Sequence, residues 1–396
     1  MNHQTMKNIS FNDTKTAFRT KSDSEIRRSY LIFAIMNQNW SVKLGTFFIK
    51  LFIYIHFPIK KLIKSTIFKQ FCGGETIEDC QPTIDSLKKS KIGTILDYSV
   101  EGEENEKSFI LTKNEILKTI EKAKNEEGIP FTVFKISGIF KTEALEEYQT
   151  ENGLSENHKS SFENSKLLLI EICETAYKND VRIFIDAEES WIQDSIDALA
   201  YEMMYKYNLK KPIIYNTYQM YRVDMYDNLE KVIKKAIKEK FYLGVKLVRG
   251  AYMEKERLRS HEENFADPIH KTKEGTDRSF NNAIDLCLKY VSRVSICIGT
   301  HNETSCSKMV QLIEEKEIPR NHPNIYFAQL LGMSDNISFI LADKGFNVAK
   351  YVPFGPINSV MPYLFRRAEE NKSISGQSSR EYTLLKNEIK RRLENV

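Results

Sequence analysis

The sequence predicts an α/β fold, a (βα)8 TIM-like barrel preceded by an N-terminal helical region. After residue 90, eight short apolar runs rich in β-branched residues alternate with helix-like segments. Short apolar strands that alternate with helices are typical of a parallel sheet covered by helices. Eight such units within residues 91–370 match the usual length of a closed barrel. An open doubly wound sheet is the alternative, but no GxGxxG follows the first run, which weakens it.

The elements are expected in the following order. Residues 1–90 read as helices separated by cap and break signals at Ser22-Asp23-Ser24, Pro58, Gly73-Gly74 and Thr76. The strands are expected at GTILDYS, FTVFKIS, VRIFIDAE, IIYNTYQMY, LGVKLVRGAY, VSICIGTHN, IYFAQLLGM and VAKYVPFGP, with helices beginning near residues 105, 162, 190, 228, 275, 303, 335 and 357. Residues 373–396 read as a basic amphipathic helix, for which three interpretations stay open: it covers the barrel, it contacts a partner, or it is solvated, which is the default. We therefore expect a helical region at 1–90, the barrel at 91–372 and a helical tail at 373–396.

Composition excludes several classes of protein. The hydrophobic content of 41% with 28% charged residues is ordinary for a globular chain and lies outside the disordered range. A net charge of +4, from 58 basic and 54 acidic residues spread along the chain, does not indicate nucleic acid as a partner. The six cysteines form no CxxC and fit neither a zinc site nor a disulfide framework, so we expect buried thiols in a reducing compartment and no metal.

The most apolar stretch, residues 42–71, is interrupted by lysines. Its longest uncharged run, 51–59, is far shorter than the roughly 20 residues of a spanning helix. Two interpretations stay open: helices packed on the main domain and broken at Pro58, which we favour, or contact with a membrane surface through the lysines. The N-terminus lacks a signal-peptide pattern, and Asp13 argues against a transit peptide. We expect a cytoplasmic protein, with peripheral contact at the inner face of the cytoplasmic membrane kept as an alternative.

Polar side chains stand where the predicted strands end. They are Lys135, Asp186, Gln219, Lys246 with Arg249 and Tyr252, His301 with Asn302, Gln329, and Tyr351. The active site of such a barrel lies at the carboxyl ends of its strands, and inward polar groups there are costly unless they are used or paired. We therefore expect an active site at this rim, and a buried ion pair between Lys135 and Asp186 on neighbouring strands. A satisfied core histidine is the alternative for His301.

The last barrel helix is expected to carry Tyr363, Arg366, Arg367 and Glu370 on one face, at spacings of three, four and seven. Two adjacent guanidiniums suit a carboxylate that is bound bidentately, whereas a solvated face with an Arg366–Glu370 pair is the alternative. The excess of cations at the rim suits an anionic cofactor with a carboxylate substrate. Lys135 as the Schiff-base lysine of an aldolase is a second candidate chemistry. The residues alone indicate a barrel enzyme that binds anions.

Six segments resemble the proline dehydrogenase family: IDAEESW, YNTYQMY, GVKLVRGAYMEKER, GTHNETS, FAQLLGMSDNIS and KYVPFGPINSVMPYLFRRAEEN. The chain is similar to the short monofunctional members. The resemblance implies oxidation of L-proline to Δ1-pyrroline-5-carboxylate, with hydride passing to flavin N5 of FAD and electrons passing on to a quinone. A non-catalytic protein that docks on membranes through residues 42–71 is the alternative from another class.

The resemblance also implies roles for single residues. Arg366 and Arg367 correspond to the pair that holds the proline carboxylate, and the bulky Tyr351 favours proline over hydroxyproline. The other implied substrate-site residues are Lys135, Asp186, Tyr252 and Tyr363, and the implied FAD-binding residues are Gln219 and Lys246 near the isoalloxazine, Arg249 and His301 at the phosphates and adenine half, Asn302, and Glu370. Glu101 is implied to pair with an active-site arginine.

Overall fold

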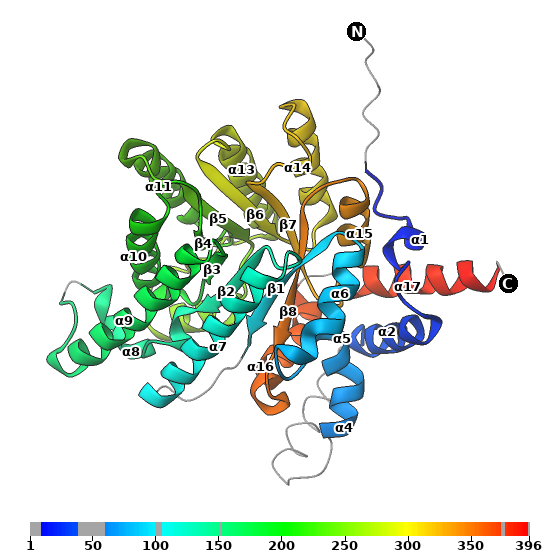
Figure 1. Cartoon of the computed structure of the whole chain (residues 1–396), viewed down its shortest axis with the longest axis horizontal. Coiled ribbons are helices and arrows are strands. Elements are labelled where there is room, and N and C mark those ends of the chain that lie inside the picture. The colour runs from blue at the N-terminus through cyan, green and yellow to red at the C-terminus, as the bar shows by residue number, and fades with distance from the viewer. Residues whose placement is uncertain (1–8, 39–59, 100–104, 151, 374–376, 395–396) are drawn as a thin grey trace.

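The computed structural model forms a closed barrel of eight parallel strands surrounded by helices (Figure 1). It describes residues 9–38, 60–99, 105–150, 152–373 and 377–394, with the backbone alone described at 368–373, 377 and 378. The strands are β1 (Ile92–Tyr98), β2 (Phe131–Lys135), β3 (Arg182–Asp186), β4 (Ile214–Gln219), β5 (Leu243–Val248), β6 (Val294–Gly299), β7 (Ile325–Leu330) and β8 (Val348–Phe354). Each strand pairs in parallel with the next, and β8 closes on β1. The predicted barrel is confirmed.

Helices connect successive strands. They are α7 (Glu106–Asn125), α8 (Thr142–Tyr148), α9 (Glu156–Lys178), α10 (Ser190–Tyr207), α11 (Met225–Glu239), α12 (Met253–Glu262), α13 (Lys273–Lys289), α14 (Glu303–Glu315), α15 (Asp335–Asp343) and α16 (Ile357–Ser373), with a 3-10 turn η3 (Ile136–Gly138) after β2. The sequence analysis missed α8 and α12, which add a second helix to the connections after β2 and β5. Both are short and mostly polar outside, so they carry little periodic pattern.

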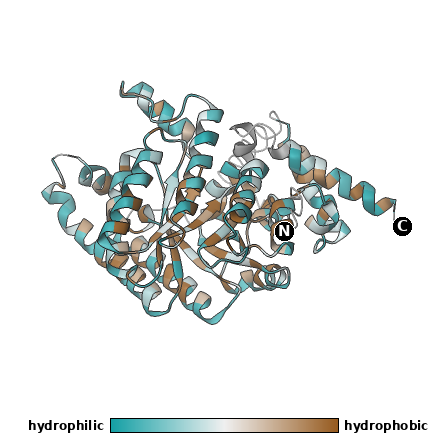
Figure 2. Ribbon diagram, turned by 90° about the horizontal axis from the view of Figure 1, so that it is seen from above, coloured by the Kyte–Doolittle hydropathy of each residue, from teal (hydrophilic) through white to brown (hydrophobic). Residues whose placement is uncertain are grey.

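The apolar residues fall into two layers, because successive strand residues face opposite sides of the sheet. Inside the barrel, Phe131 stacks on Phe184 with 4.4 Å between ring centroids, and Tyr215 packs edge-on against both. A larger layer lies between the strands and the surrounding helices. Figure 2 shows it as brown strands within a ring of helices whose outer faces are teal.

The N-terminal region precedes the barrel with α1 (Thr14–Ala17), α2 (Asp23–Met36), α4 (Lys60–Ile63), a π-helical turn η1 (Lys64–Phe68), α5 (Lys69–Phe71), a 3-10 turn η2 (Glu78–Cys80) and α6 (Gln81–Lys89). Ser22 caps α2, and Glu25 completes a capping box, as the Ser-Asp-Ser signal predicts. Ile63, Phe68 and Phe71 are buried against α2 and α16, so the packed interpretation holds for 60–71. The rest of the 42–71 stretch lies outside the described residues.

The C-terminal helix α17 (Gln377–Leu393) packs beside α2 and α1 (Figure 1). Its Leu384 and Leu385 are each only 1% exposed, and Tyr382 stacks on Tyr30 with their hydroxyls 2.8 Å apart. The expectation of a solvated tail is therefore wrong. Its apolar stripe is covered by a helix more than 340 positions earlier in the chain. The boundaries at residues 90 and 372 stay predictions.

All six cysteines are free and buried. Burial raises the pKa of all six thiols, and it raises the pKa of Cys80, Cys297 and Cys306 to about 12. Within the described ranges, no helix is long and apolar enough to cross a lipid bilayer, and no cluster of side chains is suited to hold a metal ion.

Candidate active site

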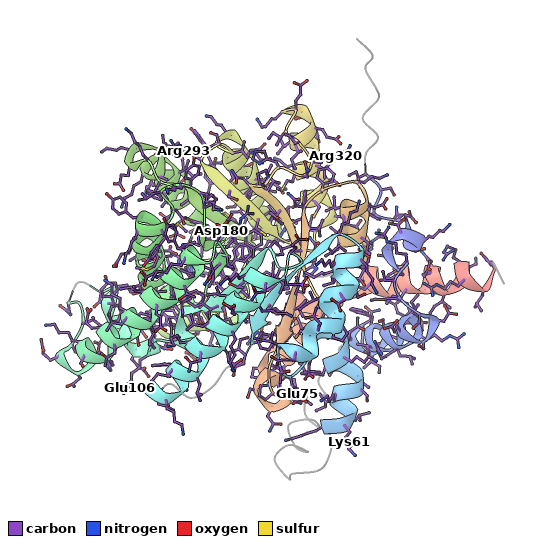
Figure 3. All side chains as sticks on the ribbon, in the orientation of Figure 1. Lys61, Glu75, Glu106, Asp180, Arg293 and Arg320 are labelled. Atoms are coloured by element: carbon purple, nitrogen blue, oxygen red, sulfur yellow. The ribbon has the colours of Figure 1, made fainter. Side chains whose placement is uncertain are left out.

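The carboxyl ends of the strands form one rim of the barrel. In Figure 3 this rim faces downward: Glu106, at the start of the helix after β1, is labelled at the bottom, whereas Arg293 and Arg320, just before β6 and β7, are labelled at the top. Lys135 and Asp186 end β2 and β3 and are directly opposite each other in the strand register. Inward-facing polar side chains from several strands therefore converge at this end.

Lys246 is the centre of this rim and is only 5% exposed. Its Nζ lies 2.5 Å from Asp186 Oδ1 and also donates a hydrogen bond to the hydroxyl of Tyr351. The ammonium lies 4.3 Å from the centroid of the Tyr351 ring, and the Tyr351 hydroxyl donates to Asp186 Oδ1 at 3.4 Å. Burial and the Asp186 carboxylate raise the pKa of Tyr351 well above its usual value, so this hydroxyl stays protonated. The three side chains form a fixed unit in which a cation, an anion and an aromatic ring face the barrel interior.

Asp97, at the end of β1, was missed by the sequence analysis. Burial and the neighbouring charge of Asp186 raise its pKa, while Lys135 and Lys246 act against that rise. Ser99 Oγ donates to its carboxylate at 2.5 Å. The signal was present, since a carboxylate ends the first apolar run, but DYS there reads equally well as a turn. The expected Lys135–Asp186 ion pair stays a prediction, and the ion pair described at Asp186 is made with Lys246.

A second missed carboxylate, Glu188, lies just beyond β3 and is 4% exposed. It accepts hydrogen bonds from the backbone N–H of Ser137 at 2.9 Å and from Ser137 Oγ at 2.5 Å. Its backbone carbonyl accepts the Gln219 amide at 2.6 Å. Burial raises its pKa and the charge of Lys135 opposes that shift. Glu188 therefore joins the loops after β2, β3 and β4 into one rigid edge.

Arg249 forms the second half of the rim, after β5. Its guanidinium donates to Asp277 Oδ1 at 2.7 Å, to Thr300 Oγ1 at 2.7 Å and to Ser305 Oγ at 2.9 Å. It also lies 4.5 Å above the ring of Phe280. These contacts hold the cation beside the N-terminus of α14, where backbone N–H groups and the helix dipole favour an anion.

The loop between β6 and α14 carries His301 and Asn302. Asn302 Oδ1 accepts from the backbone N–H of Ser305 at 2.9 Å, so this side chain caps α14, and a cofactor role for it stays a prediction. His301 Nδ1 lies 2.9 Å from Ser334 Oγ. Burial, with the cations Lys350, Arg367 and Arg249, lowers the pKa of His301 to about 3, so the imidazole is neutral at physiological pH.

This neutral histidine predicts a specific dependence of stability on pH. In the unfolded chain His301 has its ordinary pKa of 6.5 and binds a proton below that pH. In the folded protein its pKa is about 3, so it stays neutral down to that pH. Protons therefore favour the unfolded state, and this contribution to stability is lost as the pH falls below 6.5. Between pH 7.5 and 5.5, urea unfolding of the wild type should lose about 1 kcal/mol more than unfolding of His301→Asn. Equal losses in the two proteins would show that His301 titrates normally.

Gln219 and the glycine after Arg249 shape the rim between β4 and β5. Gln219 is 2% exposed and accepts from the backbone N–H of Ala251 at 3.3 Å. Gly250 has a φ of +135°, and a Cβ there would press on the ring of Tyr221. A side chain at residue 250 is thus excluded by conformation and by space. Gln329, in contrast, faces away from the interior and accepts from Ser338 Oγ on α15 at 2.8 Å, so it belongs to the packing around β7.

The helix α16 presents the arginines. Arg367 is 7% exposed, and its guanidinium lies 5.0 Å from the ring centroid of Tyr363, one turn earlier on the helix. Arg366 is half-buried beside it. Burial raises the pKa of Tyr252 to about 12, while the nearby cations Lys135 and Arg366 oppose the rise. Tyr252 therefore lies within electrostatic range of both Lys135 at the end of β2 and Arg366 on α16. The side chain of Glu370 and all of Glu101 lie outside the described residues.

The chain was compared with known families and structures. Residues 80–380 match the model of the family described as proline dehydrogenase. "Proline dehydrogenase 1, mitochondrial" of Dictyostelium discoideum is 34% identical, with 96% of this chain and 75% of the relative aligned. "Hydroxyproline dehydrogenase" of Xenopus laevis is 30% identical over 98% of this chain and 91% of the relative. "Carbapenem antibiotics biosynthesis protein CarD" of Pectobacterium carotovorum is 34% identical over 82% of this chain and 84% of the relative.

Solved structures agree on the fold. The proline utilization A protein of Bdellovibrio bacteriovorus, inactivated by N-propargylglycine, superposes with a TM-score of 0.72 at 18% identity. The match covers 92% of this chain but only 37% of that larger protein. The family match spans most of the chain and includes every rim residue described above. The chain therefore belongs to the proline dehydrogenase family.

Proposed function

We propose that this protein oxidises L-proline to Δ1-pyrroline-5-carboxylate, with FAD as its cofactor and a quinone as the final electron acceptor. The observation that carries the proposal is the pairing of a carboxylate-binding face, Arg366 and Arg367 on α16, with the buried Lys246–Asp186–Tyr351 unit at the barrel rim. The family match and the name of the Dictyostelium relative support proline as the substrate. The proposal does not depend on residues 42–59, which belong to the segment considered for membrane contact and lie outside the described residues.

The substrate is a small zwitterion with an apolar ring. Arg366 and Arg367 supply two planar guanidiniums to its carboxylate, and the Tyr363 ring beside Arg367 covers the apolar side. Tyr351 and Tyr252 supply further aromatic surface that excludes water from the reacting carbon. Tyr351 is held by Lys246 and is 6% exposed, so it has little freedom to move aside for a ring hydroxyl. This favours proline over hydroxyproline.

The residues on the β5–α14 side fit an FAD. Arg249 and the N-terminus of α14 suit its pyrophosphate, and neutral His301 suits contact with an uncharged part of the molecule. The Tyr221 hydroxyl and His270 Nε2 are buried in the loops on this side, and among the described residues neither has a hydrogen-bond partner. Buried polar atoms of this kind point to a ligand that completes them. Gln219 and Lys246 are the candidates to contact the isoalloxazine.

The reaction removes a hydride from the ring carbon next to nitrogen and a proton from nitrogen, which converts the C–N single bond into C=N. Bound FAD would accept that hydride at N5. Asp186, opposite Lys135 in the register, offers a carboxylate to the substrate nitrogen and a place for its proton. Lys246 holds that carboxylate in place, and its ammonium would favour the negative charge that develops on the cofactor side.

The first test is the visible absorption spectrum of the purified full chain before and after anaerobic addition of L-proline. We expect flavin bands that bleach with proline and return when a soluble quinone is added. Bands that bleach only with hydroxyproline would correct the substrate, in line with the Xenopus relative's name. A colourless protein that FAD does not reconstitute would overturn the proposal.

A further inference from the structure

The loop between β7 and α15, residues 331–334, is held from three sides. Gln70 of α5 donates its amide to the carbonyl of Gly332 at 2.9 Å, and a Cβ at Gly332, where φ is +76°, would overlap the Gln70 carbonyl. Lys350 of β8 is fully buried and donates to the carbonyl of Met333 at 2.5 Å. The third side is α17, which reaches the loop from the end of the chain. Three segments that lie far apart in the sequence therefore hold this loop.

Glu381 is the residue through which α17 reaches this loop. Its Oε1 accepts the backbone N–H of Ser334 at 2.5 Å, and both residues are almost fully buried. Ser334 has φ of +52° and ψ of +42°, a left-handed conformation that non-glycine residues adopt at a cost. The carboxylate stabilises that conformation by binding the N–H group it exposes. Glu381 thus determines the direction in which the Ser334 side chain points.

Ser334 in turn contacts His301, since its Oγ lies 2.9 Å from His301 Nδ1. The adjacent Thr300 accepts the Arg249 guanidinium, and Asn302 caps α14. A continuous set of contacts therefore leads from the C-terminal helix to the half of the rim that suits an anionic cofactor. The contact at Nδ1 leaves Nε2 as the ring atom available to a ligand.

Glu381 lies beside a buried cluster of two lysines and one aspartate, Lys350, Lys21 and Asp335. Asp335 pairs with both of these lysines, with Oδ1 2.8 Å from Lys350 Nζ and Oδ2 2.7 Å from Lys21 Nζ. Burial and the charge of Asp335 raise the pKa of Glu381 to about 6, although Lys350 and Lys21 oppose the rise. The hydrogen bond that Glu381 accepts from the backbone N–H of Ser334 is the contact by which it acts on the loop.

We propose that α17 contributes to the active site through two positioning residues, Glu381 and Ser334. They fix the tautomer of His301 and orient its ring toward the cofactor. This inference rests on the proposed function, because that function places FAD against His301. It gives the C-terminal segment a role that the amphipathic pattern alone did not reveal.

The test uses four variants of the full chain. Glu381→Ala removes the acceptor, and Glu381→Gln keeps an acceptor oxygen without charge. Ser334→Gly removes the hydroxyl while glycine tolerates the positive φ. Glu388→Ala is the matched control, because Glu388 is a fully buried carboxylate on the same helix that accepts from Arg391 at 2.7 Å and Arg392 at 2.8 Å, away from the loop.

The first measurement is the Kd for FAD, by fluorescence titration of the deflavinated protein. We expect Kd to rise about tenfold or more in Glu381→Ala and in Ser334→Gly, with no further rise when the two are combined, because both act through His301. Glu381→Gln should stay close to wild type, as should Glu388→Ala. An unchanged Kd in Ser334→Gly, or an equal rise in Glu388→Ala, would overturn the proposal. If Glu381→Ala does not fold, the Kd of Ser334→Gly for FAD alone tests the proposal.

The second measurement does not depend on FAD. The chain has seven histidines, so ¹⁵N spectra of the labelled side chains, assigned with a His301→Asn variant, resolve the tautomer of His301. We expect a single tautomer in the wild type and a shift toward a mixture in Ser334→Gly and Glu381→Ala. Unchanged His301 signals would refute the positioning role. If the two variants show this shift but the wild-type protein binds no FAD, the positioning role stands and the proposed function is refuted.

Discussion

Arg367→Met is expected to lower kcat/KM for L-proline by about 100-fold or more, chiefly through KM, while flavin content stays unchanged. Arg367 is almost fully buried, so in the proposed role its guanidinium would bind the substrate carboxylate away from water. Truncating one partner of such a charge-assisted pair costs roughly 2–5 kcal/mol. Arg366 remains and supplies one cation, which limits the loss. Steady-state kinetics together with the flavin absorbance of the purified variant measure both quantities.

Two comparisons make this result specific. Arg320→Met removes the same side chain at the opposite end of the barrel, where Arg320 pairs with Glu314 at 2.7 Å, and should leave proline kinetics unchanged (Figure 3). L-prolinamide lacks the carboxylate, so the preference of the wild type for proline over prolinamide should shrink in Arg367→Met. If Arg367→Met oxidises proline with wild-type kinetics, Arg367 does not bind the substrate carboxylate.

Lys246→Met is expected to slow the reduction of bound flavin by proline by about 100-fold and to make the flavin reduction potential more negative. The substitution leaves the Asp186 carboxylate without the cation 2.5 Å away and frees the Tyr351 hydroxyl that this cation holds. Under the proposed function it also removes a positive charge that would stabilise the anionic reduced cofactor. Anaerobic stopped-flow mixing with proline gives the rate, and a redox titration gives the potential.

Lys246→Arg is the matched variant, since it keeps a cation within reach of Asp186 and Tyr351. It should reduce flavin within about tenfold of the wild-type rate, because it keeps the positive charge, while the planar guanidinium accounts for the remaining loss. A Lys246→Met protein that reduces flavin at the wild-type rate would show that the ammonium plays no part in hydride transfer. A loss confined to KM would assign Lys246 to substrate binding alone.

The barrel follows from local patterns in the sequence. Short apolar runs such as FTVFK and VRIFID indicate strands that are buried on both faces. The segments between these runs have helical periodicity, and strands that alternate with helices form a parallel sheet. The positions of Lys135, Asp186 and Lys246 at strand ends follow from the same runs, since each closes an apolar stretch. The capping box at Ser22 and Glu25 is equally local.

The partners of these residues were decided by the tertiary structure. Asp186 pairs with Lys246, 60 positions away, and both bind Tyr351 a further 105 positions on from Lys246, although strand adjacency alone favoured Lys135. Which cation pairs with Asp186 depends on the direction in which each side chain points inside the closed barrel and on the space beside it. Composition and spacing do not contain that geometry.

The sequence by itself determined the closed barrel, the rim at which polar residues gather, and the arginine pair on α16, because these depend on periods of a few residues. Only the tertiary structure decided that Gln329 faces α15, that Asp97 and Glu188 belong to the rim, and that α17 is buried. It also placed Glu381 against Ser334, 47 positions earlier, and Asp335 against both Lys350 and Lys21. Such contacts join segments that lie far apart in the sequence, so no pattern with a period of a few residues indicates them.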